Sequence, residues 1–132
     1  MDRKFIFVLI GTWLVFMILA IINAIIRNAV YKPIIGDLRA HQLSTIIFII
    51  LVISITYLIL RFSHLYLSDK EALIMGLIWL VFTICFEFLA GHYVFGNSWD
   101  KLFADYNIIK GRIWSLVLIT TLFAPFISKR FL

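Results

Sequence analysis

The chain has 132 residues, of which 64% are hydrophobic and 14% are charged, and its mean hydropathy is +1.07. Soluble domains carry roughly 45–50% apolar and 25% charged residues, so this composition excludes a water-soluble globular protein. The formal net charge of +5 comes mostly from basic residues at the ends of apolar runs, where they can reach lipid phosphates. No basic stripe accompanies the charge, so it does not indicate a nucleic-acid partner.

Four apolar runs predict an all-α polytopic membrane protein with a single transmembrane domain, because a lone strand in lipid would leave its backbone groups unpaired. A helix needs about 20 residues to cross the hydrocarbon, and the fourth run is short by this measure. The first run exceeds the signal-peptide apolar region of about 7–15 residues, so we expect it to be retained. The predicted spans are 5–26, 43–60, 72–95 and 113–127.

Two of the connections carry local signals. Residues 27–42 are mixed in polarity and contain a proline and a glycine, which punctuate helices. We therefore expect a partly ordered interfacial connection there, with His41 on the surface. Ser68 and Glu71 have the spacing of a capping box, which predicts a helix start for the third span.

In the first span, Asn23 lies on the same helical face as Phe16, Ala20 and Arg27. It is the candidate polar contact of this helix. The favoured role is an interhelical hydrogen bond, which is common in membrane bundles. The alternative is that Asn23 contributes to a binding or translocation site.

Glu87 is the one carboxylate well inside a predicted span. A charge near the bilayer centre costs about 2.5–3.5 kcal/mol on insertion scales, so it must be offset by a partner, by water or by protonation. Its helical face carries both small or weakly polar residues and apolar ones, so the small-residue character is local to the turns on either side of Glu87. The small or weakly polar residues are Gly76, Thr83, Ala90 and Gly91, and the apolar ones are Trp79, Leu80, Ile84 and Val94. We expect Glu87 to face the bundle interior, either as a functional carboxylate or as a protonated group that holds helices in register.

His92 follows Glu87 by five residues, which is about 140° around a regular helix. Metal-binding pairs on helices use spacings of three or four, so these two residues are not a ligand pair. Cys85 shares a face with His92, but two ligands are too few for a zinc site. We expect no metal and no cofactor. The single cysteine also excludes an intrachain disulfide.

Residues 98–109 predict a short amphipathic helix, interfacial or re-entrant, between the third and fourth spans. Asn97 or Ser98 can cap its start. Trp99 and Tyr106 lie on its apolar face and suit the depth of lipid headgroups. The simpler interpretation is an amphipathic connector.

These elements together predict a polar pocket between the third and fourth spans, with Glu87 as its floor and the amphipathic segment as its roof. Arg112 stands at the start of the last span, where a positive charge opposes the helix dipole. This position favours Asp105 or an anionic ligand, such as a lipid phosphate, as its partner. The candidate binding or translocation residues are Asn23, Glu87, His92, Trp99, Asp105, Tyr106 and Arg112.

The pattern F-E-x3-G-H-Y-x2-G-x-S-W-x2-L-x2-D-Y-N-x3-G-R-x-W extends from Phe86 to Trp114. It resembles a family of small bacterial four-helix membrane proteins, over less than a quarter of the chain. The resemblance implies a multi-pass protein of the bacterial cytoplasmic (inner) membrane. It implies no activity, cofactor or substrate.

Three functions are compatible with these patterns. The first is a proton- or cation-linked transporter or channel component, working as an oligomer because four short helices enclose little space; Ala20 and Ala24 offer a small-residue contact for it. The second is an enzyme or binding protein for a lipid or other membrane-embedded substrate, although no catalytic motif marks an enzyme. The third is an accessory or assembly subunit of a larger membrane complex. The expected partners are membrane lipids and either further copies of the chain or a larger complex.

Overall fold

In the computed structural model, residues 2–104 and 114–131 are described, and they are helical apart from short turns. No strand occurs within these ranges, so the predicted all-α class is confirmed for this part of the chain. The helices are α1 (Arg3–Ile26), the π-helix η1 (Arg27–Tyr31), α2 (Lys32–Ile35), α3 (Asp37–Ser63), α4 (Asp69–Tyr93), α5 (Trp99–Ala104) and α6 (Trp114–Arg130).

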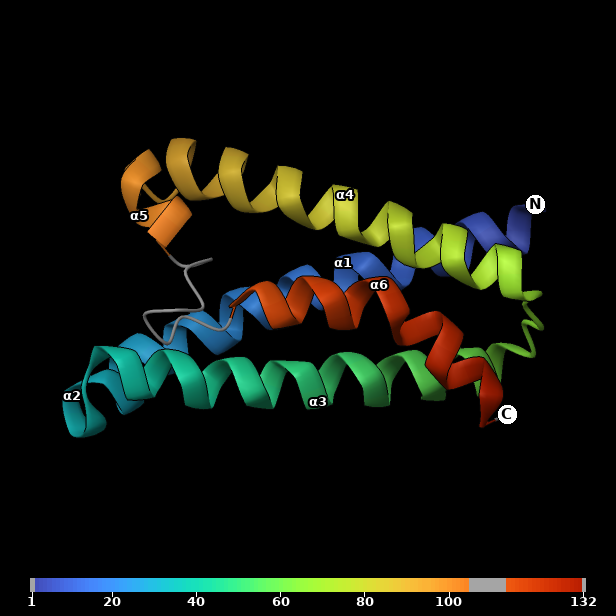
Figure 1. Cartoon of the computed structure of the whole chain (residues 1–132), viewed down its shortest axis with the longest axis horizontal. Coiled ribbons are helices and arrows are strands. Elements are labelled where there is room, and N and C mark those ends of the chain that lie inside the picture. The colour runs from blue at the N-terminus through green and yellow to red at the C-terminus, as the bar shows by residue number, and fades with distance from the viewer. Residues whose placement is uncertain (1, 105–113, 132) are drawn as a thin grey trace.

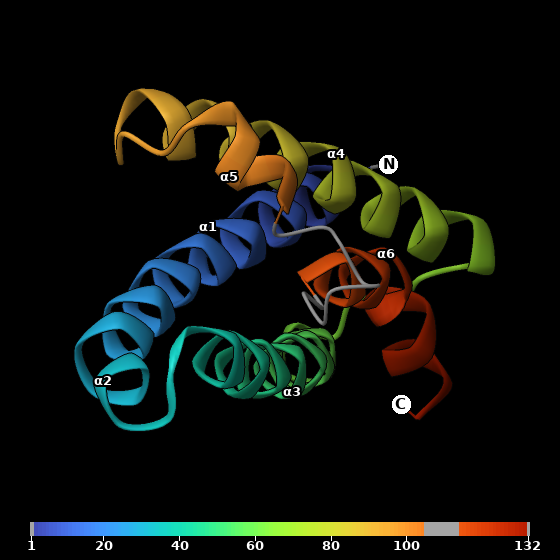
Figure 2. The same cartoon turned by 60° about the vertical axis from the view of Figure 1, so that its left-hand side comes forward.

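The helices α1, α3, α4 and α6 lie along the long axis of the molecule (Figure 1). α1 and α4 run in one direction, and α3 and α6 run in the other. Both chain termini and the connection from α3 to α4 lie at one end, here called the termini end, whereas α2 and α5 lie at the opposite α5 end. α6 packs against both α3 and α4 (Figure 2).

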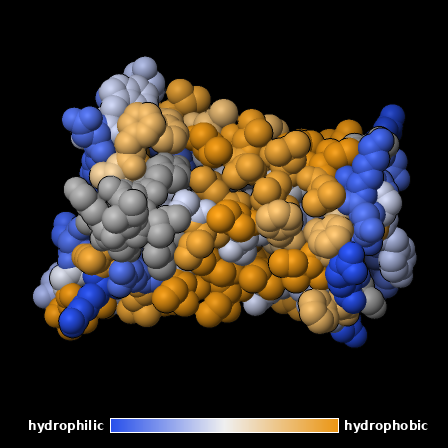
Figure 3. Space-filling view, viewed as in Figure 1, coloured by the Kyte–Doolittle hydropathy of each residue, from blue (hydrophilic) through white to orange (hydrophobic). Residues whose placement is uncertain are grey.

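Among the described residues, three helices are long and apolar enough to cross a membrane, namely the continuous stretch Arg3–Ile35, α3 and α4, with 33, 27 and 25 residues. Large apolar side chains are exposed along them, such as Phe7, Ile50 and Leu89. The space-filling view shows a belt of apolar side chains between two polar ends (Figure 3). Lipid rather than water suits an exposed belt of this kind, so the protein is an integral membrane protein.

The connection between the first two long helices differs from the sequence-based expectation. Residues 27–42 are helical except at Gly36, where we expected a partly ordered segment. Pro33 does not end the helix because it lies in the first turn of α2, where the missing N–H costs little. Gly36 has φ 88°, a backbone conformation that glycine adopts readily, and it lets the chain reverse into α3.

Polar contacts hold the termini end together. Ser68 Oγ accepts a hydrogen bond from Glu71 N at 3.1 Å, and Glu71 Oε1 accepts one from Ser68 N at 3.2 Å. The predicted capping box at the start of α4 is therefore confirmed. Lys129 of α6 forms an ion pair with Asp69, the first residue of α4. Lys4 donates to the carbonyl of His64 at 3.3 Å, which ties α1 to the end of α3.

The middle of the bundle is packed around α4. Trp79 is 1% exposed, its Nε1 donates to the carbonyl of Leu9 at 2.9 Å, and its ring lies edge-on to Phe16. Three residues before Trp79, Gly76 meets the backbone of α6 so closely that a Cβ built on it would lie 1.7 Å from the carbonyl oxygen of Leu122. α1 and α6 are therefore both held against the first half of α4.

Candidate functional site

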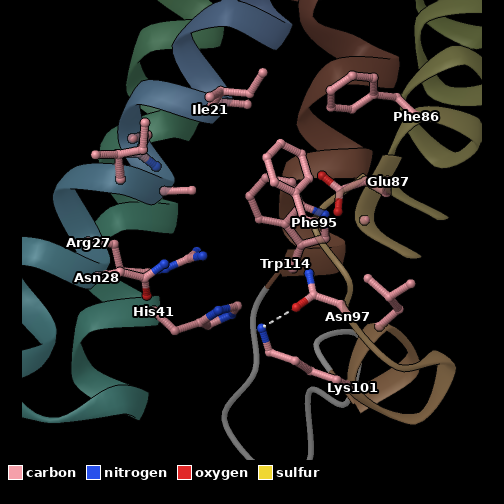
Figure 4. Close-up of a pocket in the computed structure, with 16 residues that line it drawn as sticks. Ile21, Arg27, Asn28, His41, Phe86, Glu87, Phe95, Asn97, Lys101 and Trp114 are labelled. Carbon is pink, nitrogen blue, oxygen red and sulfur yellow. Dashed lines mark hydrogen bonds between the residues drawn. The ribbon is translucent and has the colours of Figure 1, made fainter. Parts of the chain in front are cut away.

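A hollow of about 370 Å³, here called the polar hollow, lies toward the α5 end of the bundle (Figure 4). Residues from α1, η1, α3, α4, α5, the turn before α5 and the start of α6 line it. The polar lining residues are Asn23, Arg27, Asn28, His41, Glu87, Asn97 and Lys101. The others are Ala20, Ile21, Ala24, Ile25, Phe86, Gly91, Phe95, Leu102 and Trp114.

The polar hollow exists because α1 and α4 separate toward the α5 end. Near the middle of the bundle, Trp13 lies edge-on to Phe82 at 5.4 Å and to Phe86 at 6.1 Å between ring centroids. Trp13 Nε1 also donates to Thr83 Oγ1 at 3.2 Å. Beyond these contacts α4 tilts away from α1 (Figures 1 and 2), and the facing residues line the hollow instead of each other.

α5 forms one wall of the hollow. Gly96, with φ 71°, turns the chain back after α4, and Ser98 Oγ accepts a hydrogen bond from Lys101 N at 3.2 Å. Ser98 therefore caps the helix, as one of the two predicted candidates. Leu102 is 6% exposed and packs on Gly91, where a Cβ would lie 2.8 Å from Leu102 Cδ2. The absence of a side chain at Gly91 allows this close seating.

Glu87 is half-buried and lines the polar hollow from α4, in agreement with its predicted orientation toward the bundle interior. Figure 4 shows Phe86 and Glu87 on the α4 side and Arg27 and Asn28 across the hollow. The carboxylate thus shares one cavity with polar groups from η1, more than fifty residues earlier in the chain.

Asn23 forms the interhelical contact that was the favoured expectation from the sequence. Its side chain is 9% exposed, and its Nδ2 donates to the carbonyl of Ser44 at 2.9 Å, which links α1 to α3. The interhelical hydrogen bond is therefore present. Asn23 also lines the polar hollow, so the same side chain joins the helices and contributes to the cavity wall.

Two cationic side chains reach the polar hollow from different elements. Arg27 comes from η1, and Lys101 comes from α5. Lys101 Nζ donates to Asn97 Oδ1 at 3.1 Å. Within the described part of the chain, the Arg27 guanidinium has no ion-pair or hydrogen-bonded partner. The π-helical turn places Arg27 and Asn28 together on this wall, and π-helical turns in proteins often occur at functional sites.

His41 corrects the expectation of a surface side chain. It is 3% exposed and lines the polar hollow from the first turns of α3. The expectation failed because it treated residues 27–42 as a loop. Once this region is helical, His41 lies on the same face as Ser44, Thr45 and Phe48, which are all buried.

His92 and Trp99 are close to each other but are not among the residues that line the polar hollow. Their rings stack at 3.8 Å with an interplanar angle of 14°, and His92 Nδ1 lies 2.9 Å from the carbonyl oxygen of Asn97. These contacts brace the turn between α4 and α5. The sequence did not indicate the stacking, because it depends on the chain reversal at Gly96.

The remaining predicted site residues, Asp105, Tyr106 and Arg112, lie outside the described residues, as does the second half of the predicted amphipathic segment. Within residues 2–104 and 114–131, no three His, Cys, Asp or Glu side chains are close enough to hold a metal ion together. Sequence reasoning did not assign Asn28, Asn97 and Lys101 to the site. For Arg27, the sequence did offer a signal, because this residue lies on the same helical face as Asn23.

The composition of the polar hollow suits an amphipathic ligand, since cationic and amide groups lie beside aromatic and aliphatic walls. Comparison of the chain with protein families, with curated proteins and with solved structures gives no match.

Proposed function

We propose that this membrane protein binds an amphipathic molecule with an anionic group in the polar hollow. The observation that carries the proposal is the convergence of Arg27 and Lys101 on one partly apolar cavity. An anion between them would accept charge-assisted hydrogen bonds, which are stronger than neutral ones. Ile21, Phe86 and Trp114 offer surface for the apolar part of the ligand.

The charges of the lining also discriminate between ligands. Among the described lining residues, Arg27 and Lys101 are cationic and Glu87 is the one carboxylate. Positive potential in a cleft with low-dielectric walls attracts anions and repels cations. A cation pathway through this cavity is therefore disfavoured relative to an anion site.

The double substitution Arg27→Gln/Lys101→Gln should weaken the binding of hexyl phosphate at least about tenfold, since a hydrogen bond to a charged group contributes about 1.5–3 kcal/mol. Isothermal titration calorimetry in a non-ionic detergent measures the dissociation constant of hexyl phosphate for the native chain and for the variant. The matched control is Arg61→Gln/Lys70→Gln, which removes the same charge at the termini end and should leave the affinity unchanged. Equal affinities of both double variants would show that the two cations do not form the site.

A second candidate function is proton-linked transport of the same ligand, and the position of Glu87 in the lining favours it. A bound anion and an ionised Glu87 carboxylate repel each other, whereas a neutral carboxyl does not. Anion binding would therefore be coupled to proton uptake.

For this candidate we expect hexyl phosphate uptake into liposomes to be driven by a pH gradient with the native chain. Glu87→Gln should retain binding but lose the dependence on the gradient. Empty liposomes and the Arg27→Gln/Lys101→Gln variant supply the background rates. A Glu87→Gln protein whose uptake still follows the pH gradient would exclude Glu87 as the coupling group.

The membrane arrangement that accompanies the proposal has four crossings. α6 has 17 residues and rises about 25 Å, which is somewhat less than the hydrocarbon thickness of about 30 Å. We propose that α6 is the fourth crossing and that α5 lies at the interface above the polar hollow. We further propose that the protein works as an oligomer in a bacterial cytoplasmic membrane, and that membrane lipids are its immediate partners.

A further inference from the structure

A second, open hollow of about 560 Å³ runs along one face of α4, beside Trp13 of α1. Trp13 of α1 lines one side of this apolar groove, and the other lining residues come from α4. They include Phe82, Cys85, Phe86 and Leu89, and the groove ends at Tyr93 and Val94.

The groove and the polar hollow meet at Phe86, which lines both. A molecule with its polar head beside Arg27 and Lys101 would have to pass the Phe86 ring to reach the groove. Trp13 is fixed by its hydrogen bond to Thr83 and by its edge-on contact with Phe82, so this wall of the groove is preformed.

The length of the groove matches a lipid chain. From Phe82 to Val94, α4 rises about 18 Å, and one leaflet of the hydrocarbon is about 15 Å deep. Cys85 and Leu89 are exposed on the surface of a helix that is apolar enough to cross the membrane. The groove therefore faces hydrocarbon, where an acyl chain is the available occupant.

We propose that the ligand is an anionic lipid that seats its head in the polar hollow and one acyl chain in the apolar groove along α4. This inference rests on the proposed function and adds the chemical class of the ligand. It distinguishes a lipid from a free phosphate, which would occupy the polar hollow alone and leave the groove unchanged.

Cys85 is the one cysteine of the chain, and it provides a native reporter of groove occupancy. The experiment measures the rate at which N-ethylmaleimide modifies Cys85 in a non-ionic detergent, by intact mass spectrometry, because the acyl chains of a bilayer would occupy the groove before the ligand is added. Hexadecyl phosphate at about ten times its dissociation constant should slow the reaction about tenfold, because only the unoccupied fraction reacts. Butyl phosphate should bind in calorimetry without slowing the reaction.

Two variants make the result specific. In Arg27→Gln/Lys101→Gln, hexadecyl phosphate should no longer protect Cys85, because the head is not held. In Cys85→Ala/Ile50→Cys the cysteine lies at an exposed position of α3, and its reaction rate should not change with any ligand.

The outcomes separate the two proposals. If butyl phosphate binds but hexadecyl phosphate leaves the Cys85 rate unchanged, the chain does not lie in the groove, and only the proposed function survives. The inference would also be overturned if hexadecyl phosphate protected Cys85 as strongly in Arg27→Gln/Lys101→Gln as in the native chain. The same holds if it protected the cysteine at position 50 as strongly as it protects Cys85. If neither phosphate binds, the proposed function itself fails.

Discussion

Gly76→Ala should destabilise the bundle by about 3 kcal/mol, at the upper end of the range for overpacked sites. The added Cβ would lie 1.7 Å from the carbonyl oxygen of Leu122, and the obstacle is backbone rather than a flexible side chain. α4 and α6 must therefore move apart, which loosens the packing between these two helices. Small residues allow this kind of close approach between membrane helices.

Thermal unfolding in detergent, followed by circular dichroism, measures this effect, and two other glycines provide graded controls. Gly11→Ala adds a methyl group with nothing within 4 Å and should be near neutral. At Gly91 the Cβ would meet Leu102 Cδ2 at 2.8 Å, and this side chain can rotate away, so Gly91→Ala should have an intermediate effect. An unfolding temperature for Gly76→Ala that matches Gly11→Ala would contradict the described packing of α4 on α6.

Trp79→Ala should lower the free energy of unfolding by about 3–5 kcal/mol. Trp79 is 1% exposed, contacts Phe16 edge-on and donates a hydrogen bond to the Leu9 carbonyl. Lipid is as apolar as the protein interior, so the loss comes from missing van der Waals contacts and the hydrogen bond rather than from exposure to water.

The same unfolding measurement applies, with Trp79→Phe and Trp99→Ala as comparators. Trp79→Phe keeps an aromatic ring but removes the donor, so about 1 kcal/mol should be lost with the hydrogen bond. Trp99 is 41% exposed, and Trp99→Ala should affect stability much less than Trp79→Ala. If the order of the two alanine variants is reversed, the buried contacts of Trp79 do not hold α1 against α4 as described above.

The sequence predicted the parts of the fold that depend on local patterns. The lengths of the apolar runs predicted the positions of the three longest helices, and the Ser68–Glu71 spacing predicted the start of α4. Helical geometry also placed Glu87 on the inward face of α4 and Asn23 on the inward face of α1. Each of these predictions required only residues within a few turns of one another.

The parts that could not be predicted depend on contacts between distant segments. His41 became a lining residue because residues 27–42 continue as helix, and the polarity of that stretch concealed this. Lys101 reaches the hollow because Gly96 reverses the chain and Leu102 seats on Gly91. Such juxtapositions follow from tertiary packing, which overrides local preference.

The contacts of α4 with its neighbours leave its last turns as a short lever. Gly76 meets α6, Asp69 pairs with Lys129, and Trp13 of α1 contacts α4 as far as Phe86, whereas Tyr93 lies about 10 Å of helical rise beyond Phe86. A rotation of about 10° about Phe86 moves Tyr93 by about 2 Å. The width of the polar hollow can therefore change with little disturbance of these contacts, and α5 moves with the end of the lever.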